Sequence, residues 1–93
     1  MRVIGNIEHP HLKITIFKMD SRISVKFENG LYEQTYKLGQ DERLSTVEAI
    51  QQWVDARLLE EVSAVFQHMH RLRMESFARI FPAGDDSEFE DIV

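Results

Sequence analysis

The chain contains no cysteine, only two prolines and four glycines among 93 residues, and no long apolar run. Without cysteine it can form no disulfide, no thiolate metal site and no cysteine nucleophile. Because no stretch of about 18 apolar residues occurs, we expect no membrane-spanning helix. Residues 1–5 lack the pattern of a signal peptide, so we expect a cytoplasmic protein.

What the chain does contain is ordinary globular material, with 43% hydrophobic and 29% charged residues. Small domains are commonly stabilised by disulfides, by a structural metal or by oligomerisation. With no disulfide and no thiolate site, oligomerisation is the route that remains. We therefore expect a homodimer, with a further protein partner as a second possibility.

The net charge of −5 is unevenly distributed along the chain. Residues 1–82 carry eleven basic and eleven acidic residues and are neutral. A neutral body argues against bulk nucleic-acid binding, which requires charge that neutralises phosphates. Residues 83–93 are predicted to form a flexible acidic tail, or alternatively an interaction tail that presents Phe89 and Ile92. The excess acids are Asp85, Asp86, Glu88, Glu90 and Asp91.

Alternating hydrophobicity predicts an antiparallel meander over residues 12–38. The pair Asn29-Gly30 is typical of a two-residue type I′ turn, which would place Phe27 opposite Tyr32. The same register places Lys26 opposite Glu33. The further pairs that it predicts are Val25 with Gln34, Ile23 with Tyr36 and Ser24 with Thr35.

A second hairpin is predicted at Asp20-Ser21, and it keeps the apolar residues of three strands on one face. Residues Val3 to Ile7 would add a fourth strand at the edge, although Gly5 weakens it. The predicted pairs of the second hairpin are Ile14 with Phe27, Ile16 with Val25 and Lys18 with Ile23.

A helical segment is predicted to begin at Ser45, which with Glu48 has the spacing of a capping box. Neither proline nor glycine interrupts residues 46–81. One apolar stripe at helical spacing is expected to pack on the sheet. Its members are Val47, Ile50, Val54, Leu58, Val62, Val65, Met69 and Leu72.

This segment is too long for a compact domain. Thirty-six helical residues would span roughly 54 Å, whereas a compact chain of this size has a radius of gyration near 12 Å. The helix must therefore break, for which we predict the stretch 67–71, or project from the sheet. A projecting helix would leave Phe66, Leu72, Phe77 and Phe81 in need of a partner.

The predicted dimer interface combines a second apolar edge of the helix with nearby cations. An antiparallel pair would set acidic segment 46–61 beside basic segment 67–79, although helix-dipole effects explain the same distribution. Trp53 lies off the main stripe and would either wrap a sheet edge or anchor a partner. The other predicted interface residues are Leu59, Phe66, Phe77 and Phe81, with Arg71, Arg73 and Arg79 as charge partners.

Motifs of catalysis are absent from the sequence: it has no G-x-S-x-G, no P-loop and no G-x-G-x-x-G. His9 and His11 could share a metal ion in an extended segment, but only with a third, distant ligand. His68 and His70 lie about 200° apart on a helix and could not. We expect no catalytic residue, no metal and no cofactor, with a small enzyme or metal site at a subunit interface as an alternative.

The outer face of the sheet offers another alternative, single-stranded nucleic-acid binding. Basic residues around an aromatic ring are typical of such faces. The candidate residues are Lys13, Phe17 and Lys26.

Together these patterns predict an α+β domain over residues 1–82, with an antiparallel meander of three to four strands in 1–38. A long C-terminal helix, or two helices in series, would cover one face of the sheet from residues 45–81. The predicted function is a non-catalytic protein-interaction module that self-associates.

Overall fold

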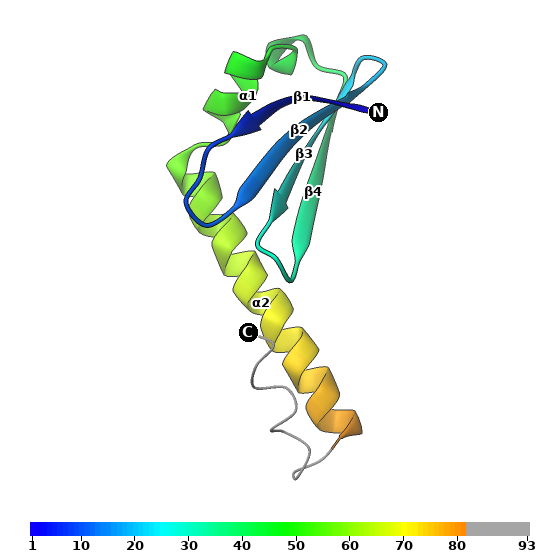
Figure 1. Cartoon of the computed structure of the whole chain (residues 1–93), viewed down its shortest axis with the longest axis vertical. Helices are drawn as coiled ribbons and strands as arrows, with labels where there is room; N and C mark the ends of the chain where they lie inside the picture. The colour runs from blue at the N-terminus through cyan, green and yellow to red at the C-terminus, as the bar shows by residue number, and fades with distance from the viewer. Residues whose placement is uncertain (82–93) are drawn as a thin grey trace.

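The computed structural model describes residues 1–81, and the predicted acidic tail lies outside these residues. The chain forms a four-stranded antiparallel sheet followed by helices, as Figure 1 shows, so the predicted α+β architecture is confirmed. The sheet has the order β1-β2-β3-β4. The elements are β1 (Arg2–Ile7), β2 (Lys13–Met19), β3 (Arg22–Glu28), β4 (Glu33–Gly39), the 3₁₀ turn η1 (Glu42–Leu44), α1 (Val47–Trp53) and α2 (Ala56–Ile80).

The hairpin between β2 and β3 has the predicted register. Ile16 lies opposite Val25, and the pairs on either side of it follow in step. Asp20 occupies the turn with a φ of 58°, in the left-handed region that aspartate tolerates better than most residues. The apolar side chains of both strands therefore point to the same side of the sheet.

The hairpin between β3 and β4 differs from the prediction by two residues. Phe27 lies opposite Gln34 rather than Tyr32, because the loop contains four residues instead of two. The Asn29 side chain accepts hydrogen bonds from the backbone N–H groups of Leu31, at 3.2 Å, and Tyr32, at 2.9 Å. This side-chain turn takes the place of the type I′ turn.

A shift of two residues keeps Glu33 to Lys37 on their predicted faces, because the side-chain period of a strand is two. A further irregularity between Ile23 and Ser24 places Ile23 opposite Gly39 rather than the predicted Tyr36. The cross-strand neighbours do change. Lys26 now lies opposite Thr35 and reaches Glu33 only diagonally, with 3.9 Å between Lys26 Nζ and Glu33 Oε2. Ser24 lies opposite Lys37 rather than Thr35.

Strand β1 pairs with β2, and the predicted fourth strand is therefore present. The ladder has an irregularity between Val3 and Gly5. A Cβ atom at Gly5 would lie 3.3 Å from Val47 Cγ1 of α1, which is a tight contact. The missing side chain thus allows α1 to approach the sheet closely.

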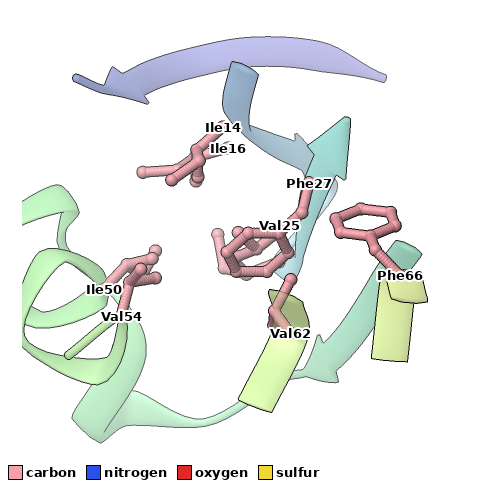
Figure 2. Close-up of a cluster of buried hydrophobic side chains, with 9 residues drawn as sticks. Ile14, Ile16, Val25, Phe27, Ile50, Val54, Val62 and Phe66 are labelled. Carbon is pink, nitrogen blue, oxygen red and sulfur yellow. The ribbon is translucent and has the colours of Figure 1, made fainter. Parts of the chain in front are cut away.

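The core lies between the inner face of the sheet and the two helices (Figure 2). α1 contributes Ile50 and Val54, and α2 contributes Val62 and Phe66. The sheet contributes Ile14, Ile16, Ile23, Val25 and Phe27.

One buried amide ties the edge strand β4 to α2. Gln34 Nε2 donates a hydrogen bond to the carbonyl oxygen of Val62 at 2.9 Å. Its Oε1 accepts a hydrogen bond from the Tyr36 hydroxyl. Both ends of this buried side chain are satisfied, as burial of an amide requires.

The helical segment breaks, but not at residues 67–71 as predicted. It breaks at Val54 and Asp55, where Asp55 caps α2 by accepting a hydrogen bond from the Leu58 N–H at 2.8 Å. The N-cap of α1 is Thr46, not Ser45, whose hydroxyl instead donates to the carbonyl oxygen of Glu42. The signal for the break is therefore a single aspartate between Val54 and Ala56, a good N-cap residue with no proline or glycine beside it.

The second helix also projects. Its 25 residues span about 37 Å, and the yellow-to-orange end runs past the β3–β4 loop in Figure 1. The molecule measures 53 × 25 × 17 Å, with a radius of gyration of 16.6 Å. A compact chain of this length would have a radius near 12 Å.

The predicted apolar stripe is only partly buried. Val65 and Leu72 are 42% and 52% exposed, although both were expected in the core. At 100° per residue, Val65 and Leu72 lie about 60° and 80° from Val62, on the side of α2 away from Phe66. α2 instead turns Val62 and Phe66 toward the sheet.

The cap at the break gives a first testable expectation. Asp55→Ala should lower the free energy of unfolding by about 1 kcal/mol, because the N–H of Leu58 loses its partner. Ser45→Ala is the matched control and should change it by less than about 0.5 kcal/mol, since Ser45 is exposed and caps no α-helix. Urea unfolding followed by circular dichroism measures both. Equal losses in the two variants would contradict these cap positions.

Candidate functional site

Two of the predicted interface residues belong to the chain's own core. Phe66 is only 5% exposed and packs with the buried side chains of the sheet. Leu59 is half-buried against the same cluster. Phe66 is therefore used almost entirely within the chain, whereas Leu59 keeps part of its surface exposed.

Two others lie at the far end of α2. The rings of Phe77 and Phe81 stack with their centroids 6.0 Å apart. The guanidinium carbon of Arg73 lies 5.7 Å from the centroid of the Phe77 ring, within the range of a cation–π contact. This end of the helix thus carries an aromatic pair with a cation beside it.

A surface that the sequence analysis missed runs along one side of α2. It consists of Val65, Met69, Leu72 and Ile80, which we call the side stripe. At 100° per residue, the four positions fall within about 80° of one another. Ile80 is 69% exposed and Met69 is half-buried. The heptad spacing of Val65 and Leu72 is visible in the sequence, which predicts Val65 in the core and Leu72 either in the core or, on a projecting helix, against a partner.

The predicted cationic partners lie on the distal half of α2. Arg71 Nε is 4.0 Å from Glu75 Oε2, one turn away, and Arg71 Nη2 is 2.6 Å from His68 Nδ1. Within α2 the charge contrast is smaller than predicted. Residues 56–66 have a net charge of −1 and residues 67–80 a net charge of +2, since the other acids of the predicted acidic segment lie before this helix.

Trp53, at the end of α1, packs against the core and the Tyr36 side chain of the edge strand β4. Its ring centroid is 6.2 Å from that of Tyr36 on β4. Tyr36 in turn packs edge-to-face on Phe27, with 5.7 Å between the centroids. Trp53 is therefore linked through Tyr36 on the edge strand to Phe27 in the core.

An open groove of about 680 Å³ lies where α2 leaves the sheet. Its main polar contact joins the Tyr32 hydroxyl to His70 Nδ1 at 2.9 Å. Ser63 also faces this groove, seven residues before His70 on the same helix. The lining residues are His11, Leu12, Asn29, Gly30, Leu31, Tyr32, Ser63, Phe66, Gln67 and His70.

The contact between Tyr32 and His70 ties the β3–β4 loop to α2. The Tyr32–His70 hydrogen bond is compatible with Nδ1 of His70 either protonated or unprotonated, because the phenolic oxygen can accept from Nδ1–H or donate to Nδ1. Tyr32 and His70 also pack edge-to-face, with 5.9 Å between ring centroids. The arrangement positions the β3–β4 loop against α2.

The His9 side chain forms part of the turn that enters β2. Its Nδ1 accepts hydrogen bonds from the backbone N–H groups of His11, at 3.1 Å, and Leu12, at 3.2 Å. Only Nε2 of His9 remains for a metal. Residues 1–81 contain no group of three histidine or carboxylate side chains placed to hold a metal ion.

On the outer face of the sheet, the charge of Lys26 is already compensated. Its Nζ lies 3.4 Å from Glu28 Oε1 and 5.3 Å from the centroid of the Phe17 ring. Lys13, the third residue of the predicted nucleic-acid surface, lies opposite Glu28 and is exposed. Stacking of a base on Phe17 would have to displace the Lys26 ammonium group.

Asp41 and Arg43 form a local, exposed ion pair, with 2.7 Å between Arg43 Nη2 and Asp41 Oδ2. Hydrogen bonds from the side chain and the backbone N–H of Arg43 lower the pKa of Asp41 to about 2. The same pair raises the pKa of Arg43. Asp41 caps the 3₁₀ turn η1, so this pair shapes the connection between β4 and α1.

Comparison with known proteins finds no matching family model, no similar curated protein and no similar solved structure. Among residues 1–81, no helix combines the length and the apolar character needed to cross a membrane.

Proposed function

We propose that the protein is a non-catalytic interaction module that self-associates through the side stripe of α2. The observation that carries the proposal is the exposure of Val65, Leu72 and Ile80 along one side of a helix that extends past the sheet. Singly exposed apolar residues are common on proteins, but three on one side of a projecting helix, flanked by the half-buried Met69, are typical of an interaction surface.

An antiparallel, two-fold pair of α2 helices fits this stripe best. Such a pair would place Val65 opposite the partner's Leu72, with Met69 near the axis. Full burial of a valine, leucine or methionine side chain contributes about 1.5–3 kcal/mol. Antiparallel packing would also bring the more basic distal half of one helix beside the more acidic proximal half of the other.

The substitution Leu72→Glu should convert the dimer to a monomer, because it places two carboxylates in the apolar centre of the proposed interface. Sedimentation equilibrium measures the dissociation constant, which we expect to rise at least about a hundredfold. The fold should survive, since Leu72 is half-exposed in the single chain, and circular dichroism checks this.

Ala78→Glu is the matched control. It adds the same charge to the same half of α2, but on an exposed position about 120° away from Leu72. We expect its dissociation constant to stay within a few-fold of that of the unsubstituted protein. If Leu72→Glu behaves like Ala78→Glu, the side stripe is not the interface.

A further inference from the structure

The sheet has two edge strands, β1 and β4, and they differ in regularity. The β1 ladder is interrupted between Val3 and Gly5, and such an irregularity protects an edge from pairing with another strand. On β4, residues Glu33 to Lys37 pair with β3 without interruption. The register shifts only after Lys37, so β4 offers a regular five-residue edge (Figure 1).

The regular stretch of this edge has a self-complementary charge pattern. Glu33 and Lys37 lie two residues before and two residues after Thr35. If two copies paired antiparallel about a two-fold axis at Thr35, Glu33 would lie opposite the partner's Lys37, and Lys37 opposite the partner's Glu33. All three side chains share the outer face of the sheet and are exposed.

Glu33 and Lys37 make few ionic contacts within residues 1–81. Lys37 forms no ion pair among residues 1–81, and Glu33 makes only the 3.9 Å contact with Lys26, which lies closer to Glu28. Glu33 and Lys37 cannot pair with each other on one strand, since four residues of extended chain span about 13 Å. A second copy would supply both missing partners at once.

We propose that β4 pairs antiparallel with β4 of a second copy about Thr35, so that the two sheets form one continuous eight-stranded sheet. The pairing would satisfy the outward backbone N–H and C=O groups of the edge. Two Glu–Lys pairs fix its register. The side chains of Gln34 and Tyr36 would lie opposite the partner's Tyr36 and Gln34 on the helix-covered side.

This contact goes beyond the proposed function because it uses a different surface from the side stripe of α2. Each contact is two-fold and closes on itself. A protein that uses both contacts therefore assembles beyond the dimer, into a tetramer or a longer alternating chain. The occupant of the edge is a second copy of this chain, since the charge pattern of the edge is complementary to itself.

Disulfide trapping tests the register directly, because the chain has no cysteine of its own. In Thr35→Cys, the two new thiols would be directly opposite, at a Cα separation of about 4.5–5.5 Å, which suits a disulfide. Lys37→Cys is the matched control on the same strand and face. Its thiols would lie about 13 Å apart. We expect rapid cross-linking of Thr35→Cys under mild oxidation and little of Lys37→Cys.

Charge exchange provides the second arm of the test. In the Thr35→Cys protein, Glu33→Lys or Lys37→Glu alone should lower the initial cross-linking rate about tenfold, because each creates two like-charge pairs. The double variant restores both pairs with opposite signs and should restore the rate. Lys13→Glu, a charge reversal on the central strand β2, should leave the rate within about twofold after correction for net charge.

Two results would overturn the proposal: equal cross-linking of Thr35→Cys and Lys37→Cys, or cross-linking of neither. A double variant that cross-links no faster than the singles would also overturn it. Repeating the Thr35→Cys experiment with Leu72→Glu separates the two interfaces. If β4 pairs independently, the cross-link still forms when the α2 contact is lost, so failure of one proposal is distinguishable from failure of the other.

Discussion

Replacing Phe27 by alanine should lower the free energy of unfolding by about 3–5 kcal/mol. The Phe27 side chain is fully buried and lies in the middle of the core, on the inner face of β3. It packs edge-to-face on Tyr36, through which it is linked to Trp53. Removal of the ring leaves a cavity between the sheet and both helices, which a close-packed core fills only partly.

This loss would be a large part of the 5–15 kcal/mol that stabilises a typical domain. Chemical denaturation followed by circular dichroism measures it as a lower midpoint with little change in slope. Phe17→Ala is the matched control, because it removes the same ring from the half-buried outer face. It should cost less than half as much. Equal costs would contradict the position of the core on the inner face of the sheet.

Replacing Phe66 by alanine should have a second large effect, a loss of about 3–4 kcal/mol in the free energy of unfolding. The side chain is 5% exposed and anchors α2 to the sheet just before the helix projects. Its hydrophobic contacts are made within one chain. The loss should therefore be the same at every protein concentration.

Leu72→Ala distinguishes the core from the side stripe. Leu72 is half-exposed in the single chain, so its truncation should change the stability of the monomer by less than about 0.5 kcal/mol. A larger loss should appear only at concentrations where the dimer forms, because a partner that binds only the folded state stabilises it by mass action. If Phe66→Ala shows the same concentration dependence as Leu72→Ala, Phe66 takes part in the interface after all.

The sequence predicts the faces of this sheet better than its register. The period of two assigns Ile23, Val25 and Phe27 to the inner face, and a two-residue slip cannot change that assignment. The slip itself came from Asn29, whose side chain closes a four-residue loop through its own hydrogen bonds. Both outcomes are compatible with Asn-Gly, so this dipeptide alone does not determine the register.

The helical segment shows a second limit of sequence-based prediction. Its excess length was evident, but the position of the break was not, because Asp55 at an N-cap and Asp55 on a helix surface give the same pattern. Within α2, the buried face is set by Val62 and Phe66, whereas Val65 and Leu72 lie about 60° and 80° from Val62 on the other side. The apolar pattern alone does not distinguish these two faces, although the excess length predicts that Leu72 of a projecting helix needs a partner.

The proposed contact at the β4 edge could not be predicted from the sequence, because the sequence does not show which strands lie at the edges of the sheet. The spacing of Glu33 and Lys37 about Thr35 is present in the sequence, but the pattern has meaning only once β4 is known to be an edge strand. In a central strand the same residues would face neighbours on both sides. The strand order and the regular ladder of β4 together turn the spacing into a candidate contact.

The central claim, self-association, is tested most directly by the absolute mass of the protein in solution. Light scattering after size exclusion, at moderate and at high salt, gives this mass without assumptions about shape, which matters for a molecule 53 Å long. We predict a mass near 22 kDa, twice the 10.9 kDa of the chain, or a multiple of it at higher concentration. High salt should weaken the Glu33–Lys37 pairs of the β4 contact more than the contact between side stripes. A mass of 10.9 kDa at every concentration and salt would contradict the account.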